Sequence, residues 1–222
     1  MPNSSEKAGQ TWVTVGEALS DLPELFPSSD SKYRLIKLNE EIPYKSDAMN
    51  SFQKIMRNWY GVESFGASAN AFRNTKRDFG IFEKMRQGDN YVDACKIADE
   101  LFEQEARVFG YKPGSAEYEK LKKKMVPVYD RDKFERKWVK LEEGKPSHTL
   151  IAHLSKDTYS HIHPIEPRGI SVREAARIQS FPDDFFFDCS MGDAYKQIGN
   201  AVPPLLSYAV AKSIYNTFSE DL

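Results

Sequence analysis

The sequence has little cysteine, little histidine and no excess of either charge. Its two cysteines, Cys95 and Cys189, lie in no Cys-x-x-Cys pair, and its four histidines are scattered. A disulfide framework and a structural zinc site are therefore not expected, and we expect no metal. The 31 basic residues nearly balance the 33 acidic ones, which gives a net charge of −2. Because there is no overall positive charge, contact with a nucleic acid requires a local basic patch.

Long apolar runs are also missing. No segment approaches the roughly 18–20 consecutive apolar residues that a membrane helix needs, and residues 1–7 lack the apolar core of a secretory signal. We therefore expect a cytoplasmic chain with no membrane partner. Its 222 residues, 40% hydrophobic and 29% charged, suffice for one domain, or for one domain with a docking segment.

Most of the regular structure that the sequence predicts is helical. Thr14 and Glu17 have capping-box spacing, and Pro23 ends the helix that they begin. Apolar residues at helical spacing, or a capping serine, predict further helices over about 49–59, 92–106 and 115–125. Alternating residues predict short strands over about 33–38, 149–154 and 159–163. The expected fold class is therefore α+β, mainly helical with a few short strands.

Charge is unevenly distributed in the middle of the chain. Residues 91–110 hold five acids and two bases, whereas residues 120–145 hold ten bases and five acids, with Tyr129, Phe134 and Trp138 among them. The basic stretch is either a surface that follows DNA phosphates or a solvated helical face whose aromatic residues lie in the core. Composition alone favours the second interpretation.

The last third of the sequence carries its most specific patterns. Ser171 and Glu174 form a second capping box, so we expect a helix from about 172 to 179, ended by Pro182. Arg173 and Arg177 lie one turn apart on one face of this helix. An arginine-rich helix face is more often structural or anion-binding than a proton shuttle, so no catalytic pair is predicted here.

A second pattern follows at residues 195–206. Gly199-Asn200 is a turn signal, and the two prolines after it suit the first turn of a helix. An apolar stripe about 100° wide then runs from Val202 to Phe218. Either this helix completes a core, or Asn200 and the free N–H groups at the helix start lie beside a polar ligand.

These two strings, Arg-x-x-Ser-x-Arg-Glu-Ala-Ala-Arg-x-Gln-x-Phe-Pro and Tyr-x-Gln-Ile-Gly-Asn-Ala-Val-Pro-Pro, resemble motifs nine and ten of the DNA (cytosine-5) methyltransferases. They stand in the family's order, and the resemblance extends from about His148 to Phe218. Residues 14–23 resemble the stretch that follows motif eight. Between these parts the family places its variable target-recognition region.

Other motifs of the family are not found in this sequence. The S-adenosylmethionine-binding loop, the Pro-Cys nucleophile, the Glu-Asn-Val motif and the Gln-x-Arg-x-Arg motif are all missing. Neither Cys95 nor Cys189 follows a proline, and we expect both to be structural. No residue is therefore predicted to be catalytic, and the chain alone is expected to be inactive.

The resemblance implies roles for residues of the two motifs. Asn200 and Ala201 match positions that approach the cofactor S-adenosylmethionine, and Gly199 allows the tight turn there. Motif nine holds the recognition region in place in the family, and its residues here are Arg173, Glu174 and Arg177.

DNA contacts are predicted in the loop 68–77 and in the basic stretch 120–140. The named candidates are Arg73, Lys76 and Arg77, as phosphate or base contacts. Each of these alone is more often an ordinary surface charge.

Taken together, these features predict a flexible arm over 1–11, a target-recognition domain over 12–165, and a segment over 166–222 that completes a Rossmann-like methyltransferase domain supplied elsewhere. The expected function is the small subunit of a split restriction–modification methyltransferase. Its partners would be double-stranded DNA and a separate catalytic chain, and the reaction would be methyl transfer to C5 of cytosine. The alternatives are a non-catalytic DNA-binding module, a degenerate remnant, or a fragment of a longer chain.

Overall fold

The computed structural model describes residues 12–25, 37–73, 75–131, 133–134, 137–156 and 158–219. The arm expected over 1–11 lies outside these ranges, as does most of the strand expected over 33–38; its last two residues are not in a strand. No helix in the described part is long and apolar enough to cross a bilayer.

Helices dominate the described residues, as the α+β expectation requires. The α-helices are α1 Val15–Leu19, α2 Ser51–Arg57, α3 Lys76–Lys84, α4 Tyr91–Val108, α5 Ala116–Met125, α6 Val172–Ile178, α7 Met191–Asn200 and α8 Pro204–Ser219. The two-residue strands are β1 Ile42–Pro43, β2 Asn58–Trp59, β3 Val62–Glu63 and β4 Gly66–Ala67, and the 3₁₀ helices are η3 Ala152–Ser155 and η4 Thr158–Ser160. Antiparallel pairs join β1 to β4 and β2 to β3.

The predicted helix starts are confirmed by their caps. The Thr14 hydroxyl accepts from the Glu17 N–H while the Glu17 carboxylate accepts from the Thr14 N–H, so both halves of the capping box form. The same reciprocal pair joins Ser171 and Glu174 at the start of α6. Ser115 caps α5 through the Tyr118 N–H. Short polar side chains at these positions satisfy helix N–H groups that otherwise have no partner.

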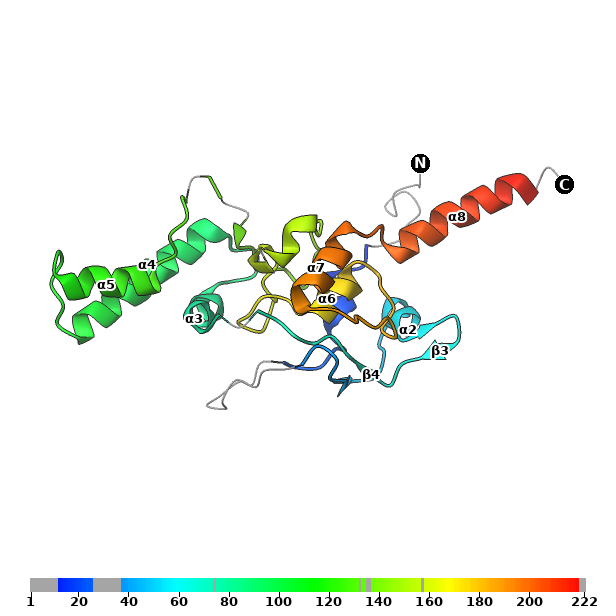
Figure 1. Cartoon of the computed structure of the whole chain (residues 1–222), viewed down its shortest axis with the longest axis horizontal. Helices are drawn as coiled ribbons and strands as arrows, with labels where there is room; N and C mark the ends of the chain where they lie inside the picture. The colour runs from blue at the N-terminus through cyan, green and yellow to red at the C-terminus, as the bar shows by residue number, and fades with distance from the viewer. Residues whose placement is uncertain are drawn as a thin grey trace.

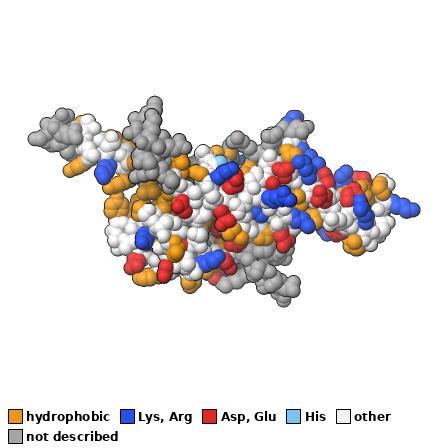
Figure 2. All heavy atoms as spheres, turned by 180° about the vertical axis from the view of Figure 1, so that it is seen from behind, with side chains coloured by type: hydrophobic (Ala, Val, Ile, Leu, Met, Phe, Trp, Pro, Cys, Tyr) orange, Lys and Arg blue, Asp and Glu red, His pale blue; other side chains and the backbone are white. Residues whose placement is uncertain are grey.

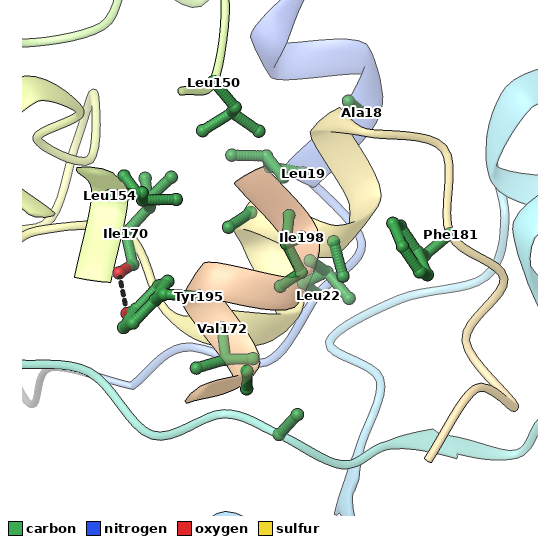
Figure 3. Packing of buried hydrophobic residues seen from close by; sticks show 14 of the residues in the cluster. Ala18, Leu19, Leu22, Leu150, Leu154, Ile170, Val172, Phe181, Tyr195 and Ile198 are labelled. Carbon is green, nitrogen blue, oxygen red and sulfur yellow. Dashed lines mark hydrogen bonds between the residues drawn. The ribbon is translucent and has the colours of Figure 1, made fainter. Parts of the chain in front are cut away.

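The main core forms where α1, α6 and α7 meet. Leu19, Leu22, Val172 and Ile198 bring apolar side chains into this cluster from all three helices and the turn after α1 (Figure 3). The Tyr195 hydroxyl is buried with them and donates to the Ile170 carbonyl over 2.7 Å. Residues separated by more than 150 positions therefore share one core.

A second cluster is aromatic and lies between α3, α4 and the segment 137–162. The Phe82, Trp138 and Tyr159 rings meet edge to face at centroid distances of 4.8–5.6 Å, and the Tyr91 ring packs on Trp138. Trp138 is thus a core residue, as the structural interpretation of the basic stretch predicted. Tyr129 and Phe134 of the same stretch are exposed.

Helices α4 and α5 form an antiparallel arm that extends from the body at one end (Figure 1). Its small core consists of Phe102, Ala106, Leu121 and Val126. The arm begins at an Asn90 capping box.

Helix α8 extends from the opposite end of the body (Figure 1). Its apolar residues Val210, Ile214 and Phe218 are exposed. In Figure 2 hydrophobic side chains gather at this end of the molecule, whereas acidic and basic side chains are interspersed over the α4–α5 arm. The interpretation that this helix completes the core of the described residues is therefore wrong.

The strands predicted over 149–163 are also wrong. Residues 152–155 and 158–160 form 3₁₀ helices, and Ile162 makes only isolated bridges, to Lys140 and Gly169. Leu150 and Leu154, four residues apart, both enter the main core, whereas Ile151 between them is exposed. The segment therefore buries residues at a helical spacing, which the alternating pattern concealed.

The sequence patterns predict no helix over α7, because Gly199-Asn200 is typical of a turn and the only helix expected here begins at the prolines that follow. These two residues instead form the end of α7. The missed signal is Ser190, whose hydroxyl accepts from the Asp193 N–H and begins the helix.

Candidate functional site

Three arginines of motif nine, Arg168, Arg173 and Arg177, are each 0% exposed. Arginine is almost never fully buried unless its charge and donors are matched. Each of the three reaches a different set of partners around α6, so this short helix joins several distant segments of the chain.

Arg168 and Glu174 form a bidentate ion pair. Two guanidinium nitrogens donate to the two carboxylate oxygens, each over 2.7 Å, and Glu166 accepts a further bond from Arg168 over 3.0 Å. The Glu174 carboxylate also accepts from the Ser171 N–H over 2.7 Å. Burial alone would raise the pKa of Glu174, but the Arg168 charge prevails and lowers it to about 2. The carboxylate therefore stays ionised as both cap and counter-ion.

Arg177 lies between two buried aspartates. It donates to Asp183 through Nε over 2.7 Å, to Asp21 through Nη1 over 2.9 Å, and to the Ala18 carbonyl over 2.9 Å. Because Asp21 follows α1 and Asp183 follows α6, this cluster fixes the N-terminal helix against motif nine. Its two carboxylates raise the Arg177 pKa against the effect of burial.

Asp21 and Asp183 also bind a layer of side chains nearer the surface, formed by Tyr44 and Arg57. Arg57, at the end of α2, pairs with Asp21 over 2.6 Å, and its guanidinium lies 3.6 Å from the centre of the Tyr44 ring. The Tyr44 hydroxyl donates to Asp183 over 2.7 Å. Beside this layer is an open cavity of about 960 Å³, lined by Pro43–Ala48, Lys54, Arg57, Asn58 and Glu63–Phe65.

Arg173 is bound by carbonyl groups. Its guanidinium donates to the carbonyls of Ser68, Pro182 and Phe185 over 2.8–3.0 Å. The first N–H groups of α6 bind the same loop, from Val172 to the Ala71 carbonyl and from Arg173 to that of Ala69. Motif nine thus holds the segment 68–71, which enters the loop predicted to contact DNA.

The residues predicted to approach the cofactor lie at the elbow between α7 and α8. Gly199 and Asn200 end α7, Ala201 follows, and the Asn200 side chain is exposed. The N–H of Leu205 in α8 is not free, because it donates to the Ser180 hydroxyl over 3.1 Å. The hypothesis that the first N–H groups of this helix are free to bind a ligand is therefore wrong for Leu205.

The predicted DNA contacts Arg73, Lys76 and Arg77 gather at the start of α3. Arg73 donates to the carbonyls of Ser155 and Lys156, and Arg77 pairs with the buried Asp78 over 2.6 Å while its side chain stays 40% exposed. Lys76 is the first residue of α3. Arg73 and Arg77 thus already serve internal contacts.

Unpaired positive charge lies elsewhere. Lys122, Lys123 and Lys124 occupy the last turn of α5. None of them forms an ion pair with any residue that the structure describes. They belong to the predicted basic stretch, and all three side chains are exposed.

Neither cysteine has the setting of a nucleophile. Cys95 is fully buried in the aromatic cluster, and burial raises the pKa of its thiol. Cys189 is half-buried, and its thiol pKa is also raised, by burial and by Asp193 and Asp188. Among the described residues no three His, Cys, Asp or Glu side chains group to hold a metal.

Sequence reasoning missed the partners of the motif-nine arginines. Asp21, Tyr44, Arg57 and Asp183 were not singled out, although Asp21 lies inside the stretch that resembles the family and Asp183 follows Pro182 directly. An unpaired buried arginine is costly, so three arginines near one helix were a signal to search for acids.

Comparison with known proteins gives consistent matches over nearly the whole chain. Residues 6–216 match the profile of the C-5 cytosine-specific DNA methylases. M.OihORF3336P of Oceanobacillus iheyensis, assigned as a type II methyltransferase, is 57% identical over 214 residues, which is 96% of this chain and 46% of that protein. The type II methyltransferase M.AgeI of Thalassovita gelatinovora is 32% identical over 231 residues, 92% of this chain and 51% of that protein.

A solved structure is similar in fold. It is the crystal structure of a protein assigned as a DNA modification methyltransferase, encoded within a prophage (E. coli), with a TM-score of 0.56 and 21% sequence identity. The match covers 95% of this chain and 48% of that one. The chain thus spans about half the length of the relatives that it matches.

Proposed function

Because the chain belongs to the C-5 cytosine-specific DNA methylase family, we propose that it is the target-recognition portion of a type II DNA (cytosine-5) methyltransferase. One observation carries this proposal: motif nine is buried as the centre of the body, whereas motif ten leads into an exposed apolar helix. Such a helix favours docking onto another domain, because a protein rarely leaves a contiguous apolar face in water.

We propose that α8 docks onto a Rossmann-like catalytic domain carried by a separate chain. That domain would supply the cofactor loop and the Pro-Cys nucleophile. The boundary predicted between residues 165 and 166 would then separate two functions but not two cores. The main core combines Val15–Leu22 with residues from 170 to 198.

S-adenosylmethionine is the cofactor of the family, and when bound it supplies the methyl group. The described chain offers few groups to hold it. Asn200 presents an exposed amide at the elbow, and the Ala201 N–H is already bound to the Ile198 carbonyl. We propose that the Asn200 amide contributes one polar contact and Ala201 one wall, while the catalytic domain encloses the rest.

Duplex DNA is the proposed substrate, methylated at C5 of a cytosine. The exposed lysines at the end of α5 are the strongest candidates for phosphate contacts, because each phosphate that is neutralised releases a counter-ion. Arg73, Lys76 and Arg77 remain proposed contacts at the start of α3. Arg77 would approach DNA with its charge partly offset by Asp78.

The test is purification of the tagged chain from its host, with mass spectrometry of the chains that accompany it. The preparation is then assayed for methyl transfer from S-adenosylmethionine to duplex DNA. We expect a stoichiometric second chain with a Pro-Cys motif, and 5-methylcytosine in the product.

Other outcomes distinguish the alternatives. A tagged protein longer than 222 residues would indicate that the catalytic domain belongs to the same polypeptide. DNA binding without any catalytic chain, and without methylation after reconstitution, would indicate a binding module or a remnant.

A further inference from the structure

The direction of α8 depends on the short elbow 201–203 between α7 and α8. Two consecutive residues at the end of α6 contact the two sides of this elbow. Gln179 donates through its side-chain amide to the Ile198 carbonyl in the last turn of α7, over 3.1 Å. The next residue, Ser180, accepts from the Leu205 N–H in the first turn of α8, over 3.1 Å. The contact with Ser180 satisfies a helix N–H that has no partner within α8, whereas the Ile198 carbonyl accepts from Gln179 and also from the Ala201 N–H at the end of α7.

Ser180 stands in an unusual backbone conformation for serine. Its φ is 58°. Its N–H donates to the Arg177 carbonyl over 2.9 Å, and the Phe181 N–H donates to the Ala176 carbonyl over 2.8 Å. These are the two hydrogen bonds of a Schellman motif, in which the left-handed residue is usually glycine because any other side chain is strained there.

Glycine would suit the backbone, but it has no hydroxyl for α8. Pro203 and Pro204 carry no N–H, so Leu205 supplies the first donor of the helix. The Ser180 side chain is buried at this junction. A strained residue that persists at a junction points to a role for its side chain.

We propose that Gln179 and Ser180 are positioning residues that clamp the α7–α8 elbow. The clamp fixes the direction in which α8 leaves the body and the place of Asn200 one residue before the elbow. Its consequence for methyl transfer rests on the proposed function, whereas the clamp itself is a property of this chain alone.

The clamp is tested by the distance between two spin labels on the full chain. Cysteines replace the exposed Lys54 in α2 and Lys212 in α8, Cys189 is replaced by serine, and Cys95 is too buried to be labelled. Double electron–electron resonance spectroscopy then gives the distribution of distances between the two labels. We expect a narrow distribution for the parent chain, and at least a two-fold broader one for Ser180→Gly and for Gln179→Ala.

Melting temperatures distinguish a positioning role of Ser180 from a role in the stability of the fold. Ser180→Gly relieves the backbone strain, so its melting temperature should equal or exceed that of the parent even though α8 loosens. Ser180→Ala keeps the strain and loses the cap, so it should melt lower. Ser180→Asn tolerates a positive φ and keeps an acceptor, and it should restore the narrow distribution. An unchanged distribution in Ser180→Gly would overturn the proposal.

In a reconstituted methyltransferase, Ser180→Gly should raise the KM for S-adenosylmethionine or weaken binding of the catalytic chain about ten-fold, with a smaller change in kcat. If the labels show a loosened α8 but no preparation methylates DNA, the clamp stands and the proposed function fails. If methylation is found and the label distances do not respond to Ser180→Gly, the proposed function stands and the clamp fails.

Discussion

Arg168 and Glu174 are joined by two parallel hydrogen bonds in the interior of the protein, and Glu174 at the same time caps the helix that begins after Ser171. One carboxylate thus neutralises a buried cation and satisfies a helix N–H. The capping box predicted from sequence is therefore part of a larger polar network, and the stability of motif nine depends on it.

Replacing Glu174 should therefore be strongly destabilising. Glu174→Gln leaves Arg168 buried with only Glu166 as a counter-ion, and loss of one partner of a buried pair costs about 3–5 kcal/mol. The free energy of unfolding, measured by urea denaturation, gives the effect. The matched control is Glu142→Gln, which breaks the exposed pair with Lys145 and should cost less than about 1 kcal/mol. If the two variants lost equal free energy of unfolding, the buried pair of Arg168 and Glu174 would contribute no more than an exposed pair.

Acid should destabilise the protein through two buried histidines. Burial lowers the pKa of His161 to about 3 and that of His163 to about 4, although Glu174 and Glu166 oppose the shift of His163. The unfolded chain binds these protons near pH 6.5, well before the folded one does. The stability from each neutral histidine is therefore complete above about pH 6.5 and is lost as the pH falls toward the folded pKa.

The slope of the free energy of unfolding against pH measures the number of protons that the chain takes up on unfolding. Each histidine contributes up to about 1.4 kcal/mol per pH unit between pH 6 and pH 4. Urea denaturation across this range should show a shallower slope for His163→Gln than for the parent. A parent whose stability is flat between pH 6.5 and 4.5 would contradict the burial of both rings.

Two buried tyrosines provide a matched pair of substitutions. The Tyr195 hydroxyl donates to the Ile170 carbonyl, whereas the Tyr159 hydroxyl is buried and only a weak contact links it to the Thr75 side chain. Tyr195→Phe should lower the free energy of unfolding by about 1–3 kcal/mol, because it leaves a buried carbonyl unsatisfied. Tyr159→Phe should be neutral or stabilising, because it removes a desolvated group. Thermal melts of both variants test this difference. A large loss of stability in Tyr159→Phe would show that the Tyr159 hydroxyl makes a stabilising hydrogen bond.

DNA binding should depend more on the end of α5 than on the start of α3. Replacing Lys122, Lys123 and Lys124 by glutamine should reduce the salt dependence of affinity for duplex DNA, by about 0.9 in the log–log slope for each phosphate that the variant no longer neutralises. Arg77→Gln should have a smaller effect, because Asp78 already holds that guanidinium. Fluorescence anisotropy at several salt concentrations measures both. Lys96→Gln, which breaks the exposed pair with Asp93, is the control. An unchanged slope in the triple variant would remove α5 from the DNA-binding surface.

Sequence predicts the local structure of this chain better than its long-range contacts. Capping boxes at Thr14 and Ser171 marked helix starts correctly, because the cap and its partner lie three residues apart and need nothing else. Alternation over 149–154 predicts a strand, but the same residues also fit a helical spacing, because Leu150 and Leu154 lie four positions apart. Only the core that receives both leucines decides between them.

The candidate site could be predicted only in part for the same reason. Arg173, Glu174 and Arg177 were located from motif nine, but their partners come from other parts of the chain. Asp21 lies 156 positions from Arg177, and Ser68 lies 105 positions from Arg173. A pattern of residue types carries no information on which acid or carbonyl will meet which arginine.

The exposed face of α8 gives the most direct test of the proposed assembly. Ile214 and Phe218 lie one turn apart near the end of the helix, and both are exposed. An aspartate at either position adds little cost in water but a large one in an apolar interface, because the charge would be buried unpaired. Ile214→Asp and Phe218→Asp should therefore leave the melting temperature of this chain unchanged while abolishing capture of the catalytic chain and methyl transfer. Lys212→Asp, also exposed on α8, shows whether charge anywhere on the helix has this effect. If the aspartate variants at 214 and 218 assemble as well as the parent, the apolar face of α8 is not the docking surface, and the partner must contact another part of the body.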